Sequence, residues 1–186
     1  MDRRLGTAAL LPWVLILSLL GAGSAELAAQ VAVPRDTLLS AARRIMAAAR
    51  HCALVTLDES GRPRVRTMDP FAPDPDMTIW MGTNRKTRKV AEIEGDARVT
   101  LYYPSPDAVG YVTVTGRARL VDDPGEKAAR WKPEWEAFYQ DRAADYILIQ
   151  VTPERLEVVD YSRGIVGDPR TWQPPFVEFP GGPSGP

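Results

Sequence analysis

A run of cationic side chains after the apolar stretch Met77–Met81 is the feature of this sequence with the clearest chemical consequence. The pair Thr83-Asn84, of a type that caps helices, precedes four cations in five residues: Arg85, Lys86, Arg88 and Lys89. Helix starts normally favour acidic side chains, because the unpaired N–H groups and the helix dipole make that end positive. Main-chain amides, hydroxyls and cations together form phosphate sites. The segment therefore predicts either a phosphate-binding helix start or a solvated basic turn.

A second basic element lies just upstream, in a segment whose alternation predicts a strand. Arg64 and Arg66 flank Val65, so their side chains share one face of that strand. Pro63 cannot donate a ladder hydrogen bond, which favours a position at a sheet edge or bulge. One loop and one strand connect this element to the cationic run. Antiparallel pairing of the two strands would bring both sets of cations to one location and form a single anion site.

The composition limits what the other residues can do. The chain has 186 residues, enough for one domain with its own core, and its 23 Lys and Arg balance 24 Asp and Glu. This balance gives no support to general binding of nucleic acid or membrane surfaces. The single cysteine, Cys52, and the single histidine, His51, exclude an intrachain disulfide and a Cys/His zinc site, and we expect no metal. Because His51 falls in an apparent buried strand, we expect no serine-type catalytic triad either.

The first 25 residues have the pattern of a secretory signal peptide. Arg3 and Arg4 form a basic start, residues 8–20 are almost entirely apolar, and small residues follow up to Ala25. We therefore expect export to the periplasm or out of the cell, with cleavage after Ala25 and no stable membrane insertion afterwards. The alternatives are a retained membrane anchor, for which the apolar run is short, and a cytoplasmic protein whose start codon is mis-assigned.

The rest of the chain alternates strands, helices and turns. Residues 34–50 predict an amphipathic helix capped by Asp36, and the segments 52–57 and 62–68, joined by turn residues, predict a β-hairpin. Further strands are expected at residues 77–81, 98–103, 109–121, 146–151 and 155–159, the last two divided at Thr152-Pro153. A helix is expected before them with the aromatic residues Trp131, Trp135, Phe138 and Tyr139.

These elements predict a mainly β protein, a small β-barrel with helices at its rim. Side chains fill the interior of such a barrel, so a sizeable ligand must bind at an edge or between subunits. We expect the barrel domain over residues 34–160, after the leader of residues 1–25. Residues 161–186 form a tail rich in Gly and Pro, and its Trp172 and Phe176 suggest a strap across a partner subunit.

Several segments follow one another in a recognisable order along residues 34–160. They are Ala53–Pro63, Arg64–Met68, Ile79–Val90, Glu94–Tyr103, Val114–Ala118, the aromatic segment with Trp131 and Trp135, and Ile149–Glu157. In this order they resemble the FMN-binding split-barrel family related to pyridoxamine 5'-phosphate oxidase. Within that family, the resemblance is strongest to the general stress protein branch.

The resemblance implies a homodimer that holds FMN at the interface between its subunits. The residues that it places along the flavin ring are Arg64, Val65, Arg66, Thr67 and Met68. Of these, Arg66 would reach the phosphate or ribityl side. The residues that it places at the phosphate are Thr83, Thr87, Arg88 and Lys89. Trp80 and Met81 would flank the cofactor or belong to the core. Tyr111 would contact the ring from the other subunit or serve only in packing.

Two departures separate the chain from pyridoxamine 5'-phosphate oxidase itself. Residues 167–175 lack the histidine-containing segment that holds the pyridoxal substrate in that enzyme, and Asp69 stands where a lysine is expected. We therefore expect an exported FMN-dependent oxidoreductase whose substrate, electron donor and catalytic residues are unassigned. The alternatives are a non-enzymatic flavin-binding or stress-related module, a split barrel that uses a deazaflavin or haem, and a barrel without a cofactor.

Overall fold

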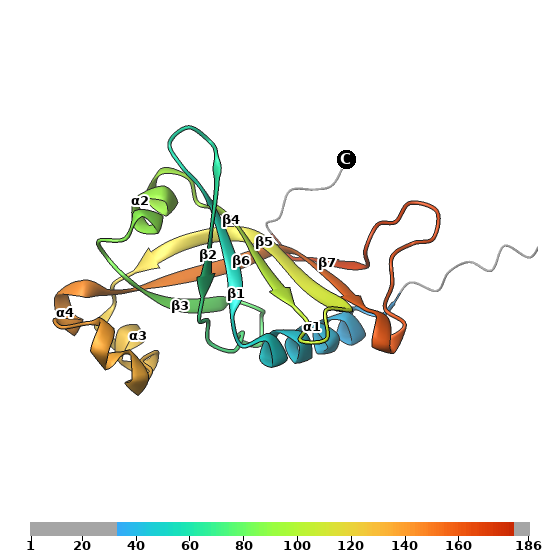
Figure 1. Cartoon of the computed structure of the whole chain (residues 1–186), viewed down its shortest axis with the longest axis horizontal. Coiled ribbons are helices and arrows are strands. Elements are labelled where there is room, and N and C mark those ends of the chain that lie inside the picture. Colours follow the sequence, from blue (N-terminus) through green and yellow to red (C-terminus); the bar gives the residue numbers. More distant parts are fainter. Residues whose placement is uncertain (1–32, 181–186) are drawn as a thin grey trace, which may run out of the picture. The chain divides into compact units, whose positions relative to one another are not determined.

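A computed structural model of the chain describes residues 33–180, and Figure 1 shows how its helices and strands are arranged. The expected signal peptide, residues 1–25, and the end of the tail, residues 181–186, lie outside the described residues. Among residues 33–180, no helix is both long and apolar enough to cross a membrane.

The predicted hairpin forms from β1 (Cys52–Leu57) and β2 (Pro63–Met68), which pair antiparallel along their whole length. Asp58 closes the turn, because its side chain accepts hydrogen bonds from the amides of Ser60 and Arg62 at 2.9 and 3.0 Å. Gly61 adopts a positive φ of 73° in this turn, a conformation that favours glycine. The turn fixes a register that puts the arginines of β2 on its less exposed face.

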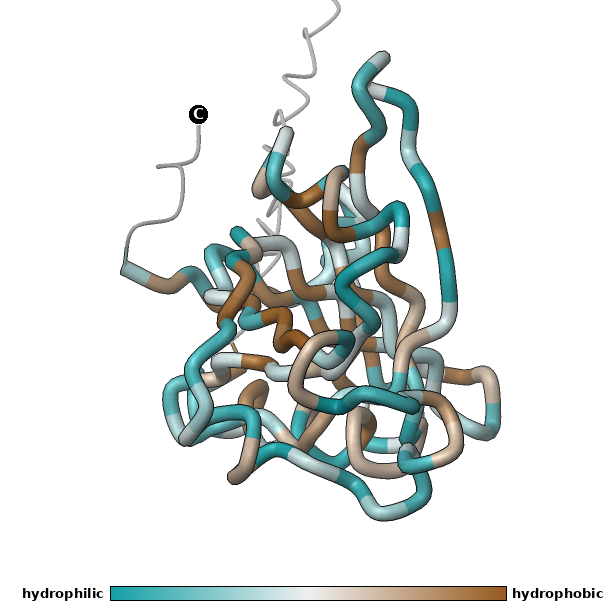
Figure 2. The backbone as a smooth tube through the Cα atoms, turned by 90° about the vertical axis from the view of Figure 1, so that its left-hand side faces the viewer, coloured by the Kyte–Doolittle hydropathy of each residue, from teal (hydrophilic) through white to brown (hydrophobic). Residues whose placement is uncertain are grey.

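The strands form one antiparallel sheet in the order β2-β1-β4-β5-β6-β3, with β7 (Phe176–Glu178) also beside β6. The remaining strands are β3 (Ile79–Asn84), β4 (Arg98–Pro104), β5 (Gly110–Val121) and β6 (Tyr146–Asp160). The sheet curls into a half-barrel with flanking helices (Figure 1), which confirms the predicted split-barrel class. The interior of the half-barrel is hydrophobic, and the outer loops are largely hydrophilic (Figure 2).

β2 and β3 do not pair as neighbours, so the predicted pairing is wrong: the two strands stand at opposite ends of the strand order. The chain just after β2 nevertheless reaches β3. Pro70 bridges Met81, and the amide of Phe71 donates to the carbonyl of Trp80 at 2.8 Å. This contact closes the curled sheet and brings the end of β2 close to the segment that follows β3.

Helix α1 (Arg35–Ala49) packs into the same core as the inner face of the sheet. Its buried face includes Leu38, Ala42 and Ile45, which belong to one cluster with the fully buried Leu101 of β4. The predicted bounds of this helix are confirmed, but Asp36 lies in the first turn rather than at the cap.

The cationic run begins in a turn rather than in a helix. Gly82, Thr83 and Asn84 continue β3 and pair with β6, so their main chain is unable to start a helix. Asn84 closes the turn instead, since its side chain accepts from the amide of Lys86 at 2.9 Å and its carbonyl from the amide of Thr87 at 3.0 Å. Helix α2 (Arg88–Gly95) therefore contains only the last two of the four cations.

β6 continues unbroken through Thr152 and Pro153, where the sequence predicts a division. A β-bulge shifts the register where Thr115 faces Arg155 and Gly116 faces Pro153, and it leaves Glu154 of β6 as the extra, unpaired residue. A Cβ atom at Gly116 would clash with the carbonyl oxygen of Thr152, so glycine allows the two strands to approach at the bulge.

The predicted aromatic helix is wrong as one element, because the segment divides into α3 (Pro124–Ala129), a 3₁₀ helix η1 (Pro133–Phe138) and α4 (Arg142–Asp145). Pro133 interrupts any helix that starts at Pro124. Trp135 and Tyr146 pack with Trp80 of β3 in a second hydrophobic cluster. This packing fixes the 3₁₀ helix against the strand that leads into the cationic run.

The described part of the tail returns to its own domain. After the 3₁₀ turn η2 (Tyr161–Arg163), β7 pairs with Arg155–Glu157, beyond the part of β6 that pairs with β3. The tail thus covers an edge of its own sheet. Trp172 is 81% exposed, and its expected contact with a partner subunit stays a prediction.

Candidate anion-binding site

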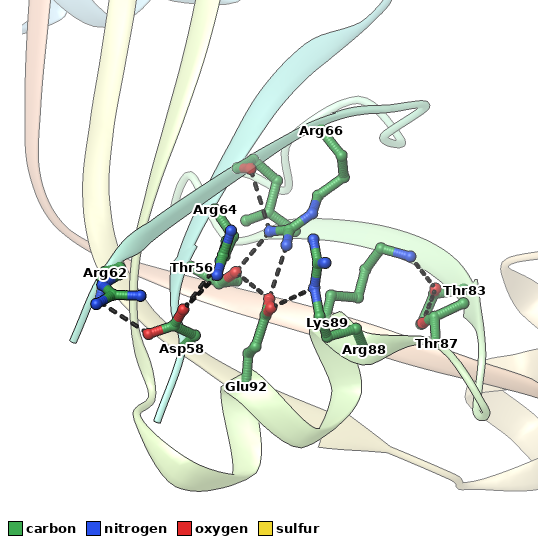
Figure 3. Close-up of polar contacts among 11 residues, drawn as sticks. Thr56, Asp58, Arg62, Arg64, Arg66, Thr83, Thr87, Arg88, Lys89 and Glu92 are labelled. Carbon is green, nitrogen blue, oxygen red and sulfur yellow. Dashed lines mark hydrogen bonds and ion pairs between the residues drawn. The ribbon is translucent and has the colours of Figure 1, made fainter. Parts of the chain in front are cut away.

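Three cations gather near one buried carboxylate where β2 faces α2 (Figure 3). Glu92, whose side chain is 4% exposed, accepts from Nη2 of Arg66 and from Nε of Arg88, both at 2.7 Å. The hydroxyl of Thr56 donates to the same carboxylate and accepts from Nη1 of Arg66, both at 2.5 Å. The Lys89 side chain lies beside them. We call Arg66, Arg88 and Lys89 the cationic cluster.

Two threonines complete the donor set on the β3 side of the cluster. Nζ of Lys89 donates to Oγ1 of Thr83 at 3.0 Å, and the hydroxyls of Thr83 and Thr87 lie 3.2 Å apart. Thr87 is the residue before α2, and its hydroxyl donates to the carbonyl of Asn84 at 2.8 Å rather than capping the helix. An ammonium group, two hydroxyls and the start of a helix therefore converge, which is a donor set suited to phosphate.

The cationic cluster carries more positive than negative charge. Burial disfavours the ionised form of Glu92, but its hydrogen bonds with Thr56 and Arg66 outweigh this effect and hold its pKa below the ordinary value. Burial lowers the pKa of Lys89, and repulsion by Arg66 lowers it further. Three cations surround one carboxylate, so two positive charges are in excess. A bound dianion would balance them.

A cleft of about 300 Å³ opens beside the cluster. It brings together five of the predicted site residues: Thr67, Met68, Thr83, Thr87 and Lys89. Its opposite wall is made by Trp135, Phe138 and Tyr139 of the aromatic segment, and Phe138 is 75% exposed. The end of β2 and three of the four predicted phosphate residues thus share one cleft, although β2 and β3 are not neighbours in the sheet; the fourth, Arg88, lines the neighbouring cleft.

The cationic run divides between this site and others. Arg85 pairs with Asp122 at 2.5 Å, and Lys86 pairs with Asp145 at 2.9 Å, so both point away from the cluster. Arg64 pairs with Asp58 of the hairpin turn at 2.8 Å. It lines a neighbouring cleft of about 580 Å³, together with Arg88 and Glu92.

Trp80 and Met81 lie in the core. Trp80 is 3% exposed and Met81 is fully buried, so their side chains do not reach the surface. The guanidinium of Arg130 covers the Trp80 ring at 3.9 Å, and the indole N–H donates to Asp74 at 2.8 Å. Their main chain pairs with β6 on one side and contacts Pro70 and Phe71 on the other. These contacts favour the core interpretation of both residues.

The remaining predicted residues lie on the outer face of the sheet. Val65 of β2 is 64% exposed, and Tyr111 of β5 packs against Tyr102 of β4 with ring centroids 5.8 Å apart. The strand registers place a set of uncharged side chains on this face: Ala53, Val55, Val65, Thr67, Thr100, Tyr102, Tyr111 and Thr113. These side chains form an uncharged area of the face, which is bordered by the charged residues Arg98, Arg117, Arg155 and Glu157. An uncharged area of this kind is suited to burial against another molecule.

Sequence reasoning missed Glu92 and Thr56, which hold the cluster together. The spacing of Arg88 and Glu92 by four residues was an available signal, because such residues share a helix face. His51 was placed wrongly: it lies exposed before β1, not inside a buried strand. The structure offers it no triad partner in the described residues. The same residues also contain no group of three His, Cys, Asp or Glu side chains that could hold a metal.

Cys52 is buried, and burial raises the pKa of its thiol to about 11. A thiol in this state has little nucleophilic character at neutral pH. The site therefore depends on cations and hydroxyls, which bind anions, and contains no activated nucleophile among the groups described above.

The curled antiparallel half-barrel with flanking helices belongs to the split-barrel class of folds. The sequence profile described as Pyridoxamine 5'-phosphate oxidase matches residues 38–160, and the chain belongs to this family. The match spans β1 to β6 and includes every residue of the cationic cluster. No curated protein matches the chain significantly.

Solved structures share the fold at low sequence identity. General Stress Protein 26 from Bacillus anthracis str. Sterne is 21% identical, with a TM-score of 0.60 over 75% of this chain and 97% of that one. An FMN binding protein related to pyridoxamine 5'-phosphate oxidase, from Nostoc punctiforme, is 16% identical, with a TM-score of 0.51 over 69% and 84%. A heme binding protein from Mycobacterium smegmatis is 19% identical, with a TM-score of 0.56 over 68% and 55%.

Proposed function

We propose that this protein binds FMN and acts as an exported flavin-dependent oxidoreductase. The observation that carries the proposal is the cationic cluster, whose two excess positive charges adjoin a cleft lined by Thr83 and Thr87. A phosphate monoester carries close to two negative charges at neutral pH and three strong acceptor oxygens. Charge and donor chemistry therefore both fit the phosphate of FMN.

The residues along the cleft have separable roles. Lys89, Thr83 and Thr87 would bind the phosphate oxygens, and Arg66 and Arg88 would add charge from the other side of the cluster. The main chain from Val65 to Met68 would orient the ring, because no strand within residues 33–180 pairs with the outer side of this edge strand. Bound FMN would supply the redox chemistry, and the protein would bind and orient it.

We also propose a homodimer with FMN at its interface. The uncharged outer face described above includes exposed Val65 and Tyr102, and it adjoins the cleft through Thr67. A second copy would bury this face by symmetric association, which is the commonest arrangement of soluble oligomers. This arrangement would place Tyr111 at the interface and exclude water from the ring.

The proposed substrate is not pyridoxamine 5'-phosphate. The segment 167–175 contains no histidine and forms a surface turn in which the amides of Arg170 and Thr171 donate to Asp168, each at 2.8 Å. Arg170 is exposed there. We propose a small-molecule substrate or electron donor of another kind, and export through the leader of residues 1–25.

The test is the absorbance spectrum of the purified protein, before and after incubation with FMN and after gel filtration. A flavin band that travels with the protein supports the proposal, and reduction of that flavin by NADH or a quinol supports the enzyme. Stable binding without reduction by any donor favours a flavin-binding or stress-related module. A haem or deazaflavin spectrum, or no bound chromophore, would overturn FMN as the cofactor. The heme binding structural neighbour makes the haem measurement worthwhile.

A further inference from the structure

We infer that Glu92 is a positioning residue that sets the charge and geometry of the cationic cluster, so that the site selects phosphate monoesters over phosphodiesters and uncharged flavins. The inference rests on the proposed function and goes beyond it, because it assigns the choice of ligand to a residue that need not touch the ligand. Glu92 acts through the two arginines that it holds.

The geometry divides the two carboxylate oxygens between the arginines. Oε2 accepts from Nη2 of Arg66, and Oε1 accepts from Nε of Arg88. Arg66 is held further by Thr56 Oγ1 and by the Leu54 carbonyl, at 2.5 and 3.3 Å from Nη1. Its side chain is only 17% exposed, so it has a single orientation available. This is a supported, pre-organised donor arrangement of the kind that precise binding requires.

Arg88 is held differently, and the difference matters for binding. Only its Nε makes a hydrogen bond within the described part of the chain, while its side chain is 68% exposed. Both of its Nη groups are therefore left for a ligand, beside the cleft of about 580 Å³ that Arg88 lines and next to Lys89 in the chain. By fixing Nε, Glu92 sets the direction of this free guanidinium fork, whose planar geometry suits two phosphate oxygens.

Without the carboxylate, the cluster would be three cations close together. The lowered pKa of Lys89, caused by burial and then by Arg66, is a sign of this repulsion even with Glu92 present. Loss of the carboxylate would drive Arg88 toward solvent, because nothing else in the described residues holds it. Glu92 therefore assembles the site before any ligand arrives.

The same carboxylate sets the net charge. With it, the cluster carries two excess positive charges, which match the nearly doubly charged phosphate of FMN at neutral pH. A phosphodiester carries one negative charge, and riboflavin carries none. Three ligands with the same ring thus form a charge series: FMN, the cyclic phosphodiester of riboflavin, and riboflavin. We expect affinity to decrease in this order.

The experiment is a comparison of Glu92→Gln with Glu94→Gln, measured by flavin fluorescence for the three ligands. Both variants remove one negative charge from α2, but Glu94 is exposed and makes no ion pair in the described residues. If charge alone mattered, both variants would bind FMN more tightly. If Glu92 positions the arginines, Glu92→Gln should lower the affinity for FMN about tenfold or more and change the affinity for riboflavin by less than about twofold. The differences in affinity among the three ligands should then become smaller.

Two further variants keep the result interpretable. Thr56→Val removes the hydroxyl between Glu92 and Arg66 without changing charge, and it should weaken FMN severalfold even if Glu92→Gln folds poorly. In an Arg88→Gln background, Glu92→Gln should have a smaller effect on FMN, because part of its action passes through Arg88. Unchanged or tighter FMN binding by folded Glu92→Gln, or equal losses for FMN and riboflavin, would overturn the inference. A wild-type protein that binds no FMN would overturn the proposed function itself.

Discussion

Replacing Lys89 with methionine removes one charge of the cationic cluster with little change in side-chain length. In the structure, the ammonium group makes one hydrogen bond within the described residues, to the hydroxyl of Thr83 at 3.0 Å. Burial and the neighbouring Arg66 both disfavour its charged form. A half-buried thioether relieves that repulsion, so we expect the free energy of unfolding of the ligand-free protein to change by less than about 0.5 kcal/mol.

The effect on FMN binding should be much larger. Hydrogen bonds to charged groups contribute about 1.5–3 kcal/mol, and about 1.4 kcal/mol corresponds to a tenfold change in affinity. Lys89→Met should therefore weaken FMN roughly 10- to 150-fold. Riboflavin lacks the phosphate, so its dissociation constant should change by less than about twofold.

Titration of flavin fluorescence at low ionic strength measures both constants. Lys86→Met is the matched control, because Lys86 belongs to the same cationic run but is 81% exposed and pairs with Asp145 away from the cleft. An exposed pair of this kind contributes little, so FMN affinity should hardly change. If Lys89→Met bound FMN as tightly as the wild type, or if Lys86→Met weakened it equally, the phosphate site would be misplaced.

Three other predictions concern pH, packing and assembly. FMN affinity should fall about tenfold from pH 7 to pH 5, because the phosphate takes up a proton near pH 6. The protein side should not change in the same way: the pKa of Glu92 is lowered, and acidification favours the charged form of Lys89. An unchanged ratio of FMN affinity to riboflavin affinity would refute this prediction. Gly82→Ala should destabilise the fold by about 1–3 kcal/mol in thermal melts, since the new Cβ would lie 2.5 Å from Tyr146 and 2.6 Å from Trp135. Gly95→Ala is the control, because its Cβ would meet no atom within 4 Å. Val65→Asp should shift sedimentation from dimer to monomer, and a dimer that persists would place the interface elsewhere.

The local elements were predictable where short-range chemistry decides them. β1 has the predicted bounds Cys52–Leu57, because alternating burial and the turn at Asp58 both lie within a few residues. The helix α1 likewise follows from its apolar spacing. The predicted residues Thr83, Thr87 and Lys89 do gather at one cleft. Their convergence needs only that the chain turn sharply after β3.

The errors arise where distant pairing decides the outcome. Asn84 is a good helix-capping residue, but pairing with Tyr146 of β6 keeps it in a strand and delays the helix to Arg88. Pro153 predicts a break, but a bulge at the adjacent Glu154, together with the close approach of Gly116 in β5, keeps β6 continuous. Neither partner is close in sequence, so no local pattern contains the information.

The direction of each cation in the candidate site was harder to predict than the presence of the cations. A cationic run gives charge but not direction, and acidic partners elsewhere in the chain decide where each cation points. Asp122 and Asp145 draw Arg85 and Lys86 away, while Glu92 retains Arg88. The sequence shows all the acidic residues, but only the fold shows which one is buried among the cations.

Asp69 stands where the family resemblance leads us to expect a lysine, and its negative charge should repel an electron-rich ligand. The structure compensates for it: Lys132 donates to Asp69 at 2.6 Å, and the indole N–H of Trp135 donates at 3.2 Å. The Lys132 ammonium also lies 5.0 Å from the ring centroids of Phe71 and Trp135, so aromatic faces hold it in place. A cation therefore stands beside the end of β2 after all, supplied by a distant segment. Asp69 therefore leaves the local charge balanced, and we expect it to cause no loss of FMN affinity.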